Sequence, residues 1–236
     1  MKVKKPKKIY SKQLVGVGVK KSRGIHTIFD IGNNLHELYR DLLLDSLEMP
    51  LNPRVNFYIF HFLKIFPWPL RGYLEASVCL LGKHSSGIEG WYPITMPVTG
   101  TLALWTGLKL GYPKYKPQSL TLKSQNGNWI GKVLYDDRAH FTLKFSPEDM
   151  DIPWRGILTT YSPFLLNSKL SGKINLMKPS VHKEKLYKEE TGMVSVTIDS
   201  DEPWTNLFNT NELKAPGIFF QWEGKKYLTR DQRKPI

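Results

Sequence analysis

The sequence predicts a β-dominated α+β protein whose strands form a barrel or a pair of packed sheets, with few short helices. Runs rich in β-branched and aromatic residues recur along the whole chain and outnumber the one clear helical pattern. Most of these runs are separated by short turns, which favours antiparallel pairing of neighbours. With 236 residues, of which 41% are hydrophobic, the chain can bury a sizeable core.

The N-terminal half is expected to contain three strands and one helix. The strands are predicted at 24–30, 55–62 and 73–81. An asparagine at 33 or 34 can cap a helix, because leucines and a tyrosine recur at helical spacing from Leu35 to Leu43. The proline-containing segment 49–53 predicts a turn between the helix and the second strand.

The C-terminal half is expected to be almost entirely extended. Asn126-Gly127, between predicted strands at 119–123 and 129–135, indicates a β-hairpin, because this dipeptide fits a type I′ turn. Further extended segments are predicted at 91–96, 101–105, 140–145, 172–177, 192–198 and 217–222. A short helix is expected at 203–209. No pattern divides the chain, so residues 24–236 are predicted to form one domain.

The positive charge is concentrated at the N-terminus. Residues 1–23 hold nine lysines and arginines and no acidic residue, and without them the net charge of +13 falls to +4. We expect a flexible, solvated basic arm at 1–23. Contact with nucleic acid or an anionic membrane is the alternative, for which the sequence offers only this charge.

The sequence favours a soluble cytoplasmic protein that works without metal or cofactor. Cys79 is the only cysteine, which excludes an intrachain disulfide and fits a reducing compartment. The N-terminus lacks an apolar signal-peptide core, and no apolar stretch is long enough to span a bilayer. The histidines show no metal-ligand spacing, and phosphate-loop, nucleophile-elbow and complete dinucleotide motifs are missing.

One segment suits covalent chemistry on a carbonyl compound. Lys114 follows Pro113, whose ring fixes φ, and lies between Tyr112 and Tyr115. A lysine amine condenses with a ketone to form a Schiff base once desolvation or a nearby cation, such as Lys116, lowers its pKa. The plain alternative is a surface lysine in a proline-rich loop.

Glu75 is the second candidate for catalysis. It lies in an apolar run that is expected to form a buried strand, where an unpaired carboxylate is costly. Alternation along the strand can instead turn it towards solvent. In one pocket with Lys114, a glutamate could orient a substrate or transfer a proton.

Three segments resemble the acetoacetate decarboxylase family in order and spacing. They are Gly72-Tyr73-Leu74-Glu75-Ala76, Gly87-Ile88-Glu89-Gly90-Trp91-Tyr92-Pro93, and Thr106-Gly107 followed by Tyr112-Pro113-Lys114. The resemblance implies a cone-shaped β-barrel wrapped by antiparallel sheet, and a homo-oligomer. It also implies that Lys114 is the Schiff-base lysine and that Glu75 is an active-site glutamate.

The sequence departs from the family pattern around the lysine. Tyr115 replaces a second lysine, Gly107 replaces an arginine, and neutral residues at 56–58 take the place of a second glutamate. We expect the substrate side of the site to comprise Arg23, Tyr58, Tyr73, Trp91, Trp105 and Tyr115.

The resulting expectation is a cofactor-independent lysine Schiff-base enzyme that acts on a keto acid or a related carbonyl compound. Decarboxylation, a carbon–carbon lyase reaction, is the default, and an aldolase-dehydratase on the same fold is the close alternative. A non-catalytic binding protein is the third hypothesis, because the aromatic residues could line a cavity for a bulky apolar ligand.

Overall fold

The computed structural model describes residues 18–66, 72–136, 138–152, 164–167, 174–208 and 210–230. In these segments the helices are α1 (His36–Leu42) and α2 (Thr101–Leu110), with the 3-10 turns η1 (Asn33–Leu35) and η2 (Pro203–Leu207). The strands are β1 (Gly18–Asp30), β2 (Arg54–Phe66), β3 (Tyr73–Lys83), β4 (Glu89–Pro97), β5 (Lys114–Tyr115), β6 (Ser119–Gln125), β7 (Asn128–Tyr135), β8 (Arg138–Pro147), β9 (Phe164–Asn167), β10 (Ile174–Ile198) and β11 (Glu212–Arg230). None of the helices in the described segments is both long and apolar enough to cross a membrane.

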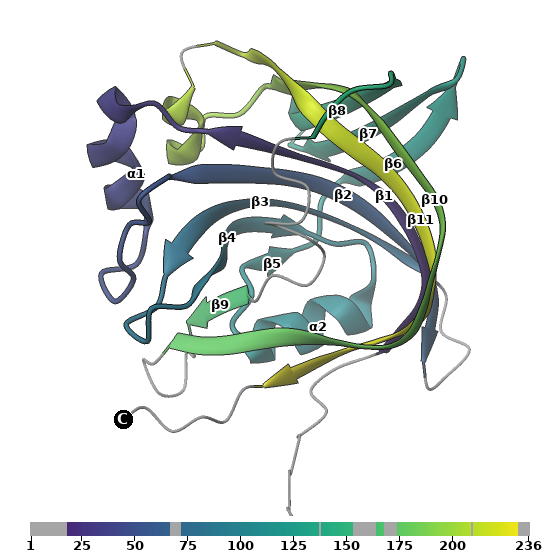
Figure 1. Ribbon diagram of the computed structural model, residues 1–236, viewed down its shortest axis with the longest axis horizontal. Coiled ribbons are helices and arrows are strands. Elements are labelled where there is room, and N and C mark those ends of the chain that lie inside the picture. Colours follow the sequence, from purple (N-terminus) through teal and green to yellow (C-terminus); the bar gives the residue numbers. More distant parts are fainter. Residues whose placement is uncertain are drawn as a thin grey trace, which may run out of the picture.

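The strands form one sheet that curls back on itself. Its order is β11-β1-β2-β3-β4-β9-β10-β8-β7-β6, with β5 beside β4. The long strand β10 pairs with β9 at its start and with β11 along most of its length, so the hydrogen-bonded neighbours form a closed ring. Figure 1 shows this curl, with α2 on its concave side near β5. The predicted β-dominated fold with few short helices is confirmed.

Strands β1 to β4 separate two buried clusters because successive side chains point to opposite faces. The first cluster lies towards β6–β8 and includes Ile25, Phe57, Val78, Leu120 and Phe141. The second face bears Ile28, Tyr58, Glu75, Cys79 and Trp91. We call it the Glu75 face. Glu75 shares this face because it lies four residues before Cys79 on β3.

Most predicted strands and the predicted hairpin are present. At the turn between β6 and β7, Asn126 and Gly127 have φ values of 50° and 78°, as a type I′ turn requires. The predicted helices near 35–43 and 203–209 appear as α1 and η2. These elements were predictable because their signals are local.

Three predictions need correction. Segment 101–105, expected to be extended, is the first half of α2. The strand predicted at 192–198 is the C-terminal end of β10, and the described part of the strand predicted at 172–177 is its beginning. Residues 18–23 of the predicted arm belong to β1 and pair with β2 and β11, because backbone partners are available on both sides. Residues 1–17 of that arm lie outside the described residues.

Candidate active site

Lys114 and Glu75 come together because β4 runs between the strands that carry them. Just past the end of β4, Val98 pairs with Glu75 of β3. On the other side of β4, Met96 pairs in parallel with Lys114. The Val98 N–H donates a hydrogen bond of 2.9 Å to the Tyr115 carbonyl, which fixes β5 against this segment. Both side chains therefore reach the Glu75 face.

The two charged groups form a buried ion pair. Lys114 Nζ lies 2.5 Å from Glu75 Oε2, and the two side chains are only 8% and 10% exposed. The Tyr58 hydroxyl donates a hydrogen bond of 3.3 Å to Glu75 Oε1. Each carboxylate oxygen thus has a donor, which offsets the cost of burying its charge.

Tyrosines surround the carboxylate and stay neutral. Burial raises the pKa of Tyr58 well above its ordinary value, and the nearby charge of Glu75 raises it further. The same two causes raise the pKa values of Tyr73 and Tyr112. Their hydroxyls therefore remain protonated at working pH. Lys114 Nζ also lies 5.2 Å from the centre of the Tyr112 ring, within the range of a cation–π contact.

The stem of Lys114 passes helix α2 at Gly107. A Cβ atom on Gly107 would lie 2.6 Å from Lys114 Cε and would also contact Cδ. A residue with a side chain would therefore displace the lysine. The sequence indicated Gly107 only as the loss of an arginine, and its contact with Lys114 emerges from the structure alone.

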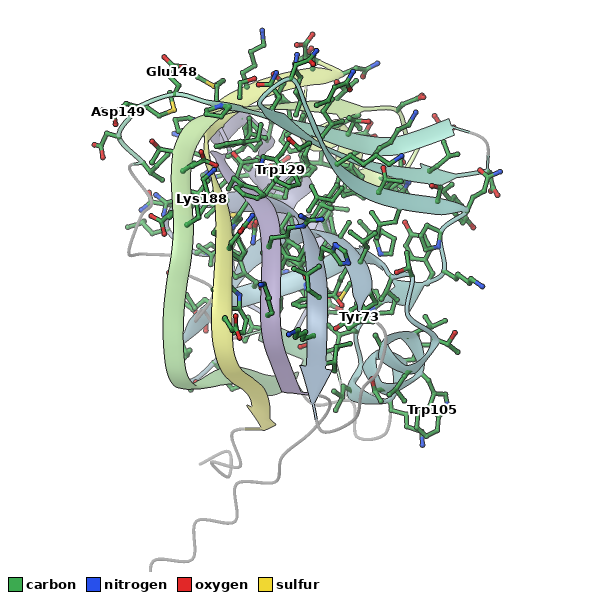
Figure 2. All side chains as sticks on the ribbon, turned by 90° about the vertical axis from the view of Figure 1, so that its right-hand side faces the viewer. Tyr73, Trp105, Trp129, Glu148, Asp149 and Lys188 are labelled. Carbon is green, nitrogen blue, oxygen red and sulfur yellow. The ribbon has the colours of Figure 1, made fainter. Side chains whose placement is uncertain are left out.

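Three of the predicted substrate-side residues lie around the pair or on its face. Tyr58 contacts Glu75 directly. Tyr73 precedes Glu75 by two residues on β3 and lies next to α2, as Figure 2 shows. Trp91 is 2% exposed and belongs to the buried cluster on the Glu75 face.

Arg23 lies on the opposite face of the sheet. Its guanidinium carbon is 5.0 Å from the centre of the Trp129 ring, and the residue two positions on, Ile25, belongs to the first buried cluster. The phase of β1 therefore directs Arg23 away from Glu75. The structure does not bring it to the pair.

Trp105 and Tyr115 also lie away from the pair. Trp105 is 56% exposed, and Figure 2 shows it pointing outwards from α2. Lys109 Nζ lies 3.5 Å above its ring. Tyr115 follows Lys114 on β5 and so points to the other face, where its hydroxyl accepts a hydrogen bond of 3.4 Å from Thr95 Oγ1. Burial there raises the pKa of Tyr115 to about 12.

Two polar residues on the Glu75 face were not assigned from the sequence. His26 is 4% exposed and lies opposite Tyr58 in the β1–β2 register. Asn56 is 3% exposed and precedes Tyr58 by two residues on β2. In the sequence, His26 and Asn56 lie two residues from Ile28 and Tyr58, so each shares a face of its strand with that residue. This spacing does not reveal which face of the sheet bears the pair.

The arrangement suits chemistry by side chains. A buried carboxylate in contact with an ammonium group can take its proton and leave an amine that attacks a carbonyl carbon. Across the described segments, no three His, Cys, Asp or Glu side chains gather as potential ligands of a metal ion.

Comparison with solved structures identifies the fold. The acetoacetate decarboxylase of Legionella pneumophila matches with a TM-score of 0.71 at 15% identity, covering 91% of this chain and 86% of that one. An acetoacetate decarboxylase-like enzyme from Sphingomonas wittichii RW1 matches with a TM-score of 0.68 at 13% identity, covering 92% and 93%. The enduracididine biosynthesis enzyme MppR, complexed with pyruvate, gives 0.67 at 13% identity, covering 92% and 91%.

No protein-family model and no curated protein matches the chain. The structural matches nevertheless extend over most of both chains in each comparison. The chain therefore has the acetoacetate decarboxylase-like fold that the three sequence segments predicted.

Proposed function

We propose that the protein is a cofactor-independent Schiff-base enzyme that acts on a keto acid or a related carbonyl compound through Lys114. The buried contact between Lys114 and Glu75 carries this proposal. The fold supports it, because proteins of this fold include a decarboxylase and an enzyme complexed with pyruvate.

The reaction begins with proton transfer within the pair. Glu75 takes a proton from the Lys114 ammonium, and the free amine attacks the substrate carbonyl carbon. The resulting carbinolamine loses water with a proton from Glu75, which gives a protonated imine. Tyr58, as a neutral donor, holds the carboxylate in place during both transfers.

The protonated imine then accepts electrons from the neighbouring bond. In a β-keto acid the carbon–carboxylate bond breaks, CO₂ leaves, and the electron pair moves into the imine to form an enamine. Protonation of the enamine carbon and hydrolysis of the imine release the ketone and restore Lys114. This decarboxylation is our leading reaction.

An aldol-type condensation with dehydration is the second candidate. One matched structure is MppR with the condensation product of pyruvate and imidazole 4-carboxaldehyde. The same imine and enamine serve this route, but the enamine carbon attacks an aldehyde, and water is then lost.

Reductive trapping tests the proposal. We would incubate the protein with pyruvate and a series of β-keto acids in the presence of cyanoborohydride and measure intact mass. The expected result is one reduced adduct on the wild type, none on Lys114→Ala, and an unchanged adduct on the control Lys109→Ala. An equal adduct on Lys114→Ala, or none on the wild type, contradicts the proposal. Release of CO₂ distinguishes decarboxylation from condensation with an added aldehyde.

A further inference from the structure

Beyond the ion pair, two of the buried polar atoms on the Glu75 face that lack hydrogen-bond partners among the described residues lie on β2 and β4, which flank β3. They are Oδ1 of Asn56, which is 3% exposed, and Nε1 of Trp91, which is 2% exposed. An unsatisfied buried polar group costs about 1–3 kcal/mol. Folded proteins contain few such groups, and those present often contact a ligand or water. Both lie on the face that bears the candidate active site.

Asn56 lies on the same face as the pair, further along strand β2. Its cross-strand neighbours are Ile28 of β1 and Cys79 of β3, both members of the buried cluster on the Glu75 face. Tyr58, which contacts Glu75, follows two residues later, roughly 7 Å along the strand. In the β2–β3 register Asn56 lies opposite Cys79, four residues and roughly 13 Å along the strands from Glu75, with Tyr58 between them.

Trp91 lies on the same face of the sheet as Asn56, on β4, the strand beyond β3. It lies opposite Leu81 of β3 and pairs with Phe164 of β9. The Phe164 ring contacts the Tyr112 ring edge-on, with the ring centres 5.7 Å apart. The ammonium group of Lys114 lies above Tyr112. Aromatic residues of one buried cluster thus lie between Trp91 and the candidate nucleophile.

We propose that Asn56 and Trp91 form a subsite for a neutral hydrogen-bonding group, such as a hydroxyl, at the far end of the substrate. This inference rests on the proposed function, because it takes the substrate carbonyl to lie at Lys114. The amide oxygen accepts a hydrogen bond from the group, and the indole N–H donates one to it. The substrate class is therefore a ketone or keto acid with an apolar or aromatic body and a distal hydroxyl.

The charges of the region favour a neutral group over a second carboxylate. Glu75 and Lys114 balance each other, and the side chains of Asn56 and Trp91 carry no charge. A charged group placed between them would be buried without a counter-ion, which costs far more than burying a hydroxyl with two hydrogen-bond partners.

Two matched ketones test the subsite: benzylacetone and its para-hydroxy derivative. We would measure their dissociation constants by titration calorimetry with the wild type, Asn56→Leu and Trp91→Phe, which keep the size of the side chain or most of it. The expected result is about tenfold tighter wild-type binding of the hydroxylated ketone, equivalent to roughly 1.4 kcal/mol. This preference should disappear in both variants, while the affinity for benzylacetone stays the same.

The remaining outcomes separate the subsite from the Schiff-base proposal. Equal affinity of the wild type for the two ketones, or no binding of either, overturns the subsite. A preference that persists in both variants overturns it as well. A third outcome combines tighter binding of the hydroxylated ketone, in both the wild type and Lys114→Met, with no adduct trapped by cyanoborohydride on the wild type. In that case the subsite holds and the Schiff-base function fails. Asn56→Leu should unfold no earlier than the wild type, because it removes an unsatisfied polar group.

Discussion

Lys114 and Glu75 depend on each other because neither charge has ready access to water. Their side chains are 8% and 10% exposed, and the contact between them is the main compensation for lost hydration. Removing one member leaves the other as an uncompensated buried charge. Removing both leaves neutral groups that the surrounding aromatic residues can accommodate.

A double-mutant cycle measures this dependence. We expect Lys114→Met to lower the free energy of unfolding by about 3 kcal/mol, because the buried Glu75 carboxylate loses its partner. The double variant Lys114→Met/Glu75→Gln should recover most of this loss. Urea denaturation gives both values, with the exposed Lys109→Met as control. Equal destabilisation of the single and double variants would show that packing of the lysine stem, and not charge, determines stability here.

The pair itself could be predicted from the sequence, whereas several of its predicted neighbours could not. Both residues were selected because the segments that contain them resemble the acetoacetate decarboxylase family; the residues alone left a surface lysine and a solvent-facing glutamate as alternatives. Whether a strand residue such as Arg23 faces the pair depends on the phase of the strand, and a shift by one residue reverses the face. Trp105 was misplaced because its segment was predicted to be extended. It belongs to helix α2, which turns its side chain away from the pair.

At the scale of elements, helix α2 forms the wall against which the lysine lies. It was missed in the sequence because its apolar residues do not form one stripe: Leu102, Trp105 and Leu108 are exposed, while Ala103 is buried. The helix ends at Gly111, whose φ of 94° allows its N–H to bond the carbonyls of the last turn.

Gly107 on this helix offers a test of how Lys114 is positioned. In Gly107→Ala the new Cβ must push the end of the lysine side chain away, because it would lie 2.6 Å from Cε. Alanine favours helix by about 1 kcal/mol over glycine, but separating the buried charges costs about 3 kcal/mol, so we expect the free energy of unfolding to fall by about 2 kcal/mol. The rate of imine trapping should fall at least about tenfold, because the amine leaves Glu75.

The matched control is Leu108→Ala, one residue further along the helix and 39% exposed. It should trap the substrate at the wild-type rate. If Gly107→Ala reacts as fast as the wild type, contact with Glu75 alone positions the Lys114 amine, and the path of the lysine side chain past α2 does not matter.

Strand β10 shows the limit of pattern reading at this scale. It runs without interruption over Ile174–Ile198, although its middle is rich in lysine and glutamate and lacks the apolar alternation of its C-terminal end. Its continuity comes from backbone pairing with β11, which a one-dimensional pattern does not reveal.

At the scale of the whole molecule, closure of the sheet gives the site its surroundings. The fold class followed from local strand signals, but the closed ring depends on β10 pairing with both β9 and β11. These contacts join segments that are distant in sequence. The homo-oligomer, the cytoplasmic location and the basic arm remain predictions.

Global stability should respond to acid through His140. This residue is 5% exposed on β8, contacts the Trp204 ring of η2, and has a hydrogen bond of 3.3 Å between Nδ1 and Ser200 Oγ. Burial lowers the pKa of His140 below 6.5, and the charge of Glu202 opposes this only in part. Between the folded and unfolded pKa values, the unfolded chain therefore binds the proton more readily.

Acidification consequently favours unfolding. Stability should fall as the pH drops below about 6.5, until the pKa of the folded state is reached, by at most about 1.4 kcal/mol per pH unit for this one proton. We expect urea denaturation between about pH 7 and pH 5 to give a flatter profile for His140→Gln than for the wild type. Parallel profiles for His140→Gln and the wild type would place the acid sensitivity elsewhere, for example at His61, whose pKa burial also lowers.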